Sequence, residues 1–214
     1  MLKFLSFGSG SSGNCYLLFT GTDCLMIDCG VGIRTLKKHF HNYGLQLKMV
    51  HNMLITHDHA DHVKSVGSVS GDLQLPVYTT EKVHSGISQN WCVRRKVDAQ
   101  FVRYLEKGEE KLIGEFKVTP FEVPHDSTDC VGYSIEHNGI RFTLITDCGH
   151  ITEEIAHFIS ISNYLVIEAN HEPEKLIAGP YPRHLKERIS GPNGHLSNEA
   201  CAQALVENAS PILH

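Results

Sequence analysis

Six consecutive residues of this chain combine side chains that bind metal ions: His57-Asp58-His59-Ala60-Asp61-His62. Their three imidazoles and two carboxylates offer nitrogen and oxygen donors, which suit Zn²⁺, Mn²⁺ or Fe ions. The chain is rich in histidine as a whole, with 15 among 214 residues. A solvated polar loop rarely concentrates histidine in this way, so the segment predicts a metal site.

The element before this segment is the apolar run NMLIT, which predicts a buried strand. In extended backbone alternate side chains face the same way, so His57 and His59 point to one side. The turn that follows redirects Asp61 and His62. One short loop at a strand end can therefore serve two adjacent metal ions.

The HxHxDH pattern of this loop resembles the metallo-β-lactamase superfamily. Other segments resemble one branch of it, the YycJ/WalJ-type bacterial exonucleases, which are related to the tRNA 3′-processing endonuclease. These segments are FGSGSSGNCYLL, the DCG after the third apolar run, EANHEPEKL and GPNGHLSNEA. They occur in the expected order, and the resemblance covers nearly the whole chain.

The resemblance implies two divalent metal ions, Zn or Mn with Fe as a third choice, and six ligands. It assigns His57, His59 and His125 to one metal, Asp61 and His62 to the other, and Asp147 to a bridge between them. A hydroxide shared by two cations about 3.5–4 Å apart is an effective nucleophile at neutral pH. Taken alone, His125 could be a hydrogen-bonded core histidine, and Asp147 could cap the helix that follows it.

A second pair of residues carries acid–base chemistry in the related tRNA-processing enzymes. By this resemblance Glu168 orients His195, which protonates the leaving group, and the two join Asp61 as catalytic residues. The alternative is that His195 merely precedes the last helix, which Ser197 caps.

The order of strands and helices predicts the fold class. Short β-rich runs dominate the front of each half of the chain, and helical segments follow them, including SNEACAQALVENA near the end. This arrangement predicts an α/β fold, a four-layer αββα sandwich, which is also the fold of the superfamily. No repeat or linker divides the chain, so we expect one hydrolase domain over residues 1–214.

The superfamily usually completes its second metal site with a histidine on a late strand. Here the chain stops at His214, about where that strand begins in the family. We therefore expect the domain to lack its extreme C-terminal strand, and His214 to lie too early to be that ligand.

Composition limits the class of protein and its compartment. The chain has 41% hydrophobic and 20% charged residues and no apolar run long enough to cross a bilayer, and its N-terminus lacks a signal-peptide layout. The seven cysteines are odd in number and form no CxxC pair, which favours free thiols in a reducing compartment. We expect a cytoplasmic protein with no membrane partner.

The leading hypothesis for function is a metal-dependent phosphodiesterase acting on nucleic acid, with DNA ahead of RNA, as an exonuclease. Two local basic clusters, at residues 91–96 and 183–188, could contact nucleic acid or could be ordinary solvated surface. One alternative function is a small ester, thioester or lactone hydrolase. Another is a non-catalytic metal-bound accessory or regulatory protein. The sequence gives no indication of oligomeric state.

Overall fold

The computed structural model describes residues 2–214, and its contacts divide the chain into two units. The first unit runs to Glu106 and includes two later segments, Leu112–Glu115 and Ser127–Asp129. The second unit consists of Lys107–Lys111, Phe116–Asp126 and Cys130–His214.

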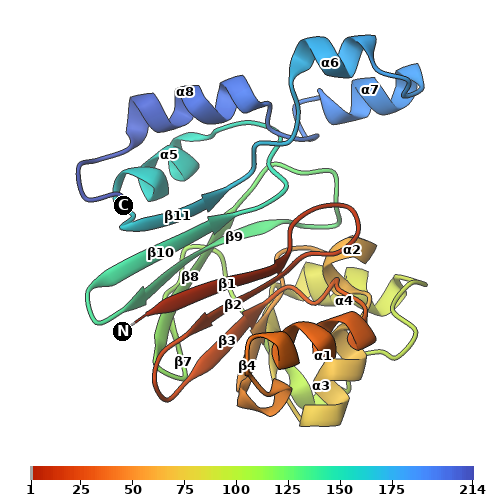
Figure 1. Cartoon of the computed structure of the whole chain (residues 1–214), viewed down its shortest axis with the longest axis vertical. Helices are drawn as coiled ribbons and strands as arrows, with labels where there is room; N and C mark the ends of the chain where they lie inside the picture. Colours follow the sequence, from red (N-terminus) through yellow and green to blue (C-terminus); the bar gives the residue numbers. More distant parts are fainter. Residues whose placement is uncertain (1) are drawn as a thin grey trace. The chain divides into compact units, whose positions relative to one another are not determined.

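The first unit is built on a six-stranded sheet with its strands in chain order. These strands are β1 Lys3–Gly8, β2 Cys15–Phe19, β3 Cys24–Ile27, β4 Asn52–Leu54, β5 Val77–Thr79 and β6 Val102–Tyr104. Strands β1 to β3 are antiparallel, whereas β3 to β6 pair in parallel. Parallel neighbours need long crossover connections, and those connections contain the helices of this unit (Figure 1).

Those helices supply the core of the first unit. They are α1 Ile33–Asn42, α2 Ala60–Val63, α3 Val66–Leu73 and α4 Glu81–Gln89, with 3-10 turns at Leu47–Met49 and Ala99–Phe101. Helix α1 turns Leu36 and Phe40 inward, four residues apart on one face. These side chains join buried residues of β2 to β5 in one hydrophobic cluster, such as Leu17 and Met53.

The second sheet has five strands in the order β11-β10-β9-β8-β7. Its strands are β7 Lys111–Ile113, β8 Phe116–Glu122, β9 Val131–His137, β10 Ile140–Ile145 and β11 Tyr164–Ile167. Strands β8 to β11 belong to the second unit, whereas β7 lies at the boundary, with only Lys111 in that unit. Asn138 and Gly139 join β9 to β10 with φ of +51° and +78°, as a tight hairpin turn requires. Strand β11 pairs in parallel with β10, so both strands end at the same edge of the sheet.

Four helices belong to the second unit: α5 Glu153–Ser160, α6 Pro173–Ala178, α7 Arg183–Ile189 and α8 Asn198–Asn208. Helices α5 and α8 share a core with the sheet, in which Phe121 and Ile145 meet Phe158 and Ala204. Helices α6 and α7 lie beyond the end of β11 (Figure 1). The last helix begins as the sequence predicts, because the Ser197 hydroxyl accepts a hydrogen bond from Ala200 N at 3.1 Å.

The strand predicted at NMLIT is β4, and the helix predicted at SNEACAQALVENA is α8. Sequence reasoning missed helices α4 and α6. Helix α4 was hard to find because Ser85, Gly86 and Ser88 are poor helix formers. Gly86 is needed there, since a Cβ at this position would collide with the carboxylate of Asp58.

All seven cysteines, which lie within residues 2–214, are free thiols, and six are buried. Burial, with the nearby carboxylate of Asp23, raises the pKa of Cys24 to about 12; burial, with Glu168, raises the pKa of Cys148 to about 12. These thiols stay neutral at physiological pH and pack as small hydrophobic groups. Within residues 2–214, the helices are too short or too polar to span a bilayer.

Candidate metal centre

Three histidine rings of the HxHxDH segment converge in the first unit. His57 follows β4 and is fully buried, His59 ends the extended stretch, and His62 lies in the short helix α2. The ring centroid of His57 lies 4.7 Å from that of His59 and 4.0 Å from that of His62. The expected change of direction after His59 is therefore made by α2.

The carboxylate of Asp28 fixes the orientation of His62. Asp28 is buried, and its Oδ2 lies 2.7 Å from Nδ1 of His62 and 2.9 Å from the Thr56 hydroxyl. With Nδ1 donating to a carboxylate, Nε2 of His62 keeps its lone pair, as metal-binding histidines require. Sequence reasoning assigned Asp28 no role, although its DCG segment was noted as part of the resemblance.

The glycine-rich loop before β2 also contacts the motif. The side-chain amide of Asn14 lies 2.8 Å from Nε2 of His62, and Asn14 Oδ1 accepts from Gly10 N at 2.8 Å. This orients the amide N–H toward the lone pair of His62, where a metal ion would bind. The motif backbone also packs on Gly30, where a Cβ would collide with the carbonyl of Asp61.

Asp58 is the one acidic residue of the motif that acts as a structural group. Its carboxylate accepts hydrogen bonds from the Thr128 hydroxyl at 2.6 Å and from Thr128 N at 3.2 Å. Its carbonyl accepts from the Asn90 side chain at 2.7 Å. Thr128 comes three residues after His125, so Asp58 fixes the chain just beyond a second predicted ligand.

In the second unit, His125 follows β8 and is buried. Its Nδ1 lies 3.0 Å from the carbonyl oxygen of Gly194, to which it donates, so Nε2 is the atom left for a metal. This Nε2 lies 3.7 Å from Oδ2 of Asp147 and 3.5 Å from Oδ1 of Asp126. The ring is hydrogen-bonded and buried, as expected for a core histidine, but it also faces Asp147, another predicted metal ligand.

Asp147 follows β10 and lies at the edge of the sheet where β11 also ends. It does not cap helix α5, because Thr152 does so by accepting a hydrogen bond from Ile155 N. His214 lies at the other end of the strand pair. It hydrogen-bonds through its backbone to Asn163, and its ring lies against Tyr164, so it is not beside Asp147.

Glu168 and His195 form the expected pair, with Oε1 2.7 Å from Nδ1 of the imidazole. The other oxygen of Glu168 accepts from the backbone N–H groups of Cys148 at 2.9 Å and Leu196 at 3.1 Å. Asp147, Glu168 and His195 each offer one atom that could bind a metal, and these three atoms lie within 4.8 Å of one another. However, Glu168 is already occupied by these donors, so it orients His195 rather than binding a metal.

Burial lowers the pKa of His195, but the hydrogen bond and negative charge of Glu168 raise it more, with smaller contributions from Asp147 and Asp126. The net effect is a raised pKa, which favours the protonated ring near neutral pH. Protonated at both nitrogens, His195 donates Nδ1–H to Glu168 and keeps Nε2–H available for a reacting group.

The donor chemistry of both units fits divalent metal ions. Three imidazoles have Nδ1 in contact with an oxygen: His57 with Thr56 at 3.0 Å, His62 with Asp28, and His125 with Gly194. Such contacts fix the tautomer and the ring direction at metal sites. Together with carboxylates, these rings form an N/O donor set of the kind that Zn²⁺, Mn²⁺ and Fe prefer.

Comparison with known proteins identifies the family. Residues 24–211 match the family model described as a beta-lactamase superfamily domain, so the chain belongs to this family. The chain is 33% identical to the exodeoxyribonuclease YycJ of Bacillus anthracis, over 96% of this chain and 77% of that protein. It is 31% identical to the exodeoxyribonuclease WalJ of Streptococcus pneumoniae serotype 2, over 95% and 76% of the two chains.

Solved structures agree on the fold. Zn²⁺-bound PqqB from Methylobacterium extorquens superimposes with a TM-score of 0.72 at 18% identity, over 91% of this chain and 80% of that one. The short form of human tRNase Z gives a TM-score of 0.68 at 17% identity, over 96% and 88%. The expected fold class, the αββα sandwich of the metallo-β-lactamase superfamily, is confirmed, and the chain is a metal-dependent hydrolase.

Proposed function

We propose that this protein is a two-metal phosphodiesterase that acts in the cytoplasm as a DNA exonuclease. The observation that carries the proposal is the Glu168–His195 pair, an oriented imidazole whose pKa is raised, with Asp147 close by. Similarity to two exodeoxyribonucleases over nearly the whole chain supports DNA as the substrate class. The free, neutral thiols support a reducing compartment.

The proposed metal centre uses the six ligands that the family resemblance assigns. These would be His57, His59, Asp61, His62, His125 and Asp147. The support is the family pattern together with the orientation of the imidazoles within each unit. The metal ions, Zn²⁺ or Mn²⁺ with Fe as a third choice, would activate water as a hydroxide and neutralise the phosphodiester.

The chain's own residues then perform three tasks. Asp28 and the Gly194 carbonyl hold two ligand rings in the ligating tautomer. Glu168 holds His195 and favours its protonated form. His195 delivers the Nε2 proton to the departing sugar oxygen, which avoids expulsion of an unstable alkoxide.

The first test is a substrate screen. Labelled single- and double-stranded DNA and RNA are incubated with the protein and Mn²⁺, Zn²⁺ or Mg²⁺, and the products are sized. We expect mononucleotides to be released from DNA ends. Turnover of small lactones or thioesters, with nucleic acid left intact, would instead support the alternative hydrolase.

The second test measures metal content. We expect about two metal equivalents in the wild type, and the loss of at least one after Asp147→Ala. Asp72→Ala is the matched control, because Asp72 is an exposed carboxylate paired with Arg95 and should leave metal content unchanged. Full metal content in the Asp147 variant would contradict the ligand assignment. One metal or none in the wild type would favour the non-catalytic accessory protein.

A further inference from the structure

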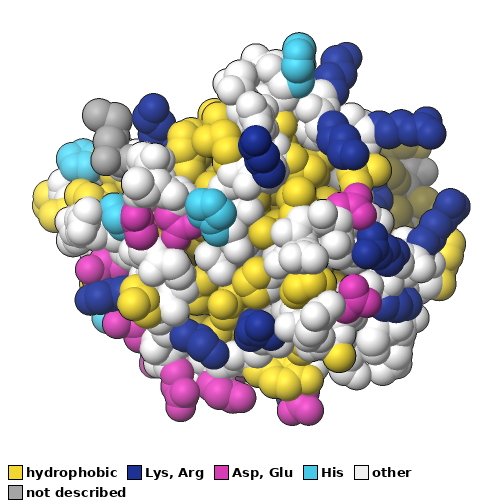
Figure 2. Space-filling model, turned by 90° about the horizontal axis from the view of Figure 1, so that it is seen from below, with side chains coloured by type: hydrophobic (Ala, Val, Ile, Leu, Met, Phe, Trp, Pro, Cys, Tyr) yellow, Lys and Arg dark blue, Asp and Glu magenta, His cyan; other side chains and the backbone are white. Residues whose placement is uncertain are grey.

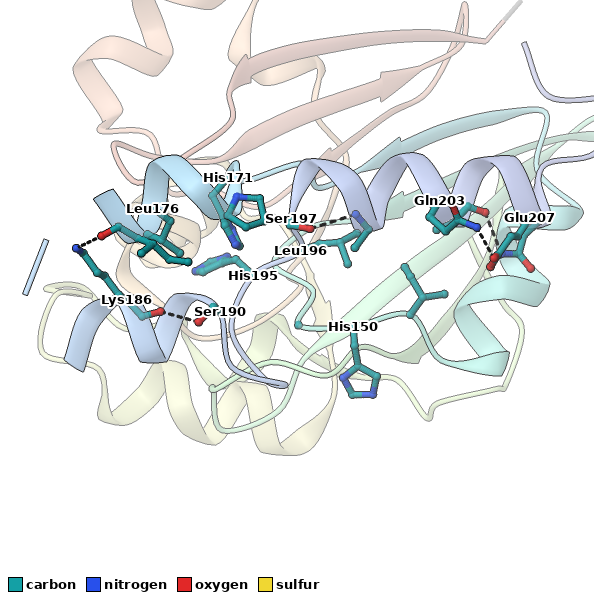
Figure 3. A pocket seen from close by; sticks show the side chains of 17 residues that line it. His150, His171, Leu176, Lys186, Ser190, His195, Leu196, Ser197, Gln203 and Glu207 are labelled. Carbon is teal, nitrogen blue, oxygen red and sulfur yellow. Dashed lines mark hydrogen bonds between the residues drawn. The ribbon is translucent and has the colours of Figure 1, made fainter. Parts of the chain in front are cut away.

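The second unit contains a cavity of about 490 Å³, and His195 is the one residue of its lining to which the proposed reaction gives a role. Helices α6, α7 and α8 form its walls, together with the turn after β10 (Figure 3). Its volume falls in the range of small-molecule sites, about 300–1,000 Å³. His195 is one of its lining residues, so the cavity adjoins the proposed proton donor.

The lining has three kinds of surface. At one end, the imidazoles of His171 and His195 lie side by side, with Lys186 nearby (Figure 3). The middle is apolar, with Leu176, Leu196 and Ala200 among its residues. At the far end, Gln203 and Glu207 supply an amide and a carboxylate joined by a hydrogen bond of 2.5 Å.

His171 gives a second, independent observation. Its Nδ1 is buried and has no hydrogen-bond partner, which is costly for a polar atom. Burial lowers the pKa of His171; Glu168 opposes this effect and His195 adds to it. The lowered pKa favours the neutral ring, which can both donate and accept. A ligand with polar edges in this cavity could satisfy that nitrogen after a small ring rotation.

The combination of an apolar middle and polar ends in this cavity fits a nucleobase. A nucleobase has two flat faces, which suit the apolar middle of the cavity, and a rim of hydrogen-bonding groups, which suits its polar ends. The Lys186 ammonium binds the carbonyl of Ile177 at 2.5 Å rather than a carboxylate, so its charge can attract a phosphate. A purely apolar ligand would leave the buried Nδ1 of His171 without a hydrogen-bond partner.

We propose that the cavity binds the base of the nucleotide whose sugar oxygen is protonated by His195. The inference rests on the proposed function, because it is the leaving-group role of His195 that selects the nucleotide. Apolar contacts in the middle of the cavity hold the faces of the base, while His171 and Gln203 contact its edges. The cavity thereby retains the leaving nucleotide at the proton donor and helps to position the scissile bond.

The test uses two variants of helix α8. Ala200→Phe fills the cavity, because Ala200 lines it. Ala202→Phe is the matched control, since Ala202 lies on the same helix, is exposed and does not line the cavity. Thermal unfolding of both variants confirms that they are folded before binding is measured.

The first measurement is binding without catalysis. Wild-type protein is titrated with dAMP and with 2-deoxyribose 5-phosphate, and the imidazole NMR signals of His150 and His171 are followed. We expect saturable shifts with dAMP, little change with the base-free sugar phosphate, and loss of the dAMP shifts in Ala200→Phe alone. Equal shifts with both probes, no shift at all, or unchanged shifts in Ala200→Phe would overturn the proposal.

The second measurement separates this proposal from the proposed function. We expect Ala200→Phe to lower kcat/KM for an oligodeoxynucleotide at least tenfold, while hydrolysis of bis(4-nitrophenyl) phosphate, which has no base, stays normal. If Ala200→Phe cleaves DNA at the wild-type rate, the cavity does not bind the base, and the proposed nuclease activity is unaffected by that result. A wild-type protein that binds dAMP in the cavity but cleaves no DNA would refute the nuclease, while base recognition by the cavity would still be supported.

Discussion

At the scale of single residues, the site depends on which nitrogen of each imidazole is occupied. His62 and His125 use Nδ1 to contact an oxygen of the protein, so Nε2 is the atom that would bind a metal. At His62 the metal would replace the contact between Nε2 and the Asn14 amide. His195 makes the same kind of contact with Glu168, but its raised pKa favours the protonated ring, which suits the proton-donor role that we propose. In this proposal histidine serves two roles, and the partner at Nδ1 together with the surrounding charge decides between them.

The general-acid role predicts a substrate-dependent defect. His195→Ala should lower turnover of DNA by about 10²–10⁴-fold with metal content unchanged. The loss should be smaller for a nitrophenyl phosphodiester, because nitrophenolate departs without a proton. His184→Ala is the control, since His184 is exposed on α7. Equal defects on both substrates would rule out proton donation, and loss of metal would indicate a ligand instead.

The pH profile gives a related signature of the pair. Activity needs protonated His195, so it should fall as pH rises through the raised pKa of this ring. Glu168→Gln removes the charge that raises the pKa, so the alkaline fall should move to lower pH.

Asp28 allows a prediction about metal affinity. Asp28→Asn keeps the shape of the side chain and tolerates the φ of +59° at this position, but it weakens the contact to His62. We expect metal affinity to fall about 10–100-fold, measured by competition with a chelator. Asp23→Asn is a matched control, because Asp23 forms a similar pair with His51 at 2.8 Å. An equal loss in both variants would mean that the effect is not local to the site.

At the scale of elements, the sequence predicted the strands and the motif loop, because apolar periodicity and clustered histidines are local signals. The partners of the ligands are not local. Asp28 contacts His62 from 34 residues away, and Gly194 contacts His125 from 69 residues away. Such pairs form only when strands and loops come together, so spacing alone could not predict them. Helix α4 was missed for the same reason, since Gly86 reflects contact with Asp58.

The contact between Asp58 and Thr128 yields the element-scale prediction. Thr128→Val removes one hydrogen bond to the carboxylate and should lower stability by about 0.5–1.5 kcal/mol. It should also weaken metal binding several-fold, because the chain beyond His125 is less restrained. Thr22→Val removes a comparable exposed bond to Glu115 and should lower stability alone. Unchanged metal affinity in Thr128→Val would show that this contact does not position the ligand.

At the scale of the whole molecule, charge is mixed rather than concentrated. The net charge is −5, and on the face drawn in Figure 2 acidic side chains lie among the lysines and arginines. Within the basic clusters, Arg95 pairs with Asp72, Arg183 with Glu187 and Arg188 with Asp126. The DNA binding that we propose therefore requires local contacts, such as the cavity beside His195, because the protein has no long-range positive field to attract the nucleic acid.

The chain passes between its two units several times within residues 107–130, where short segments alternate between them. No single linker exists in this region at which the units could separate, so we expect residues 1–214 to unfold as one domain. Native-state hydrogen exchange should give amides of β3 and β10 the same free energy of opening, and urea unfolding should be a single transition by circular dichroism and by NMR. Two separate transitions, or protection that persists in one sheet after the other has opened, would show that the units are independent domains.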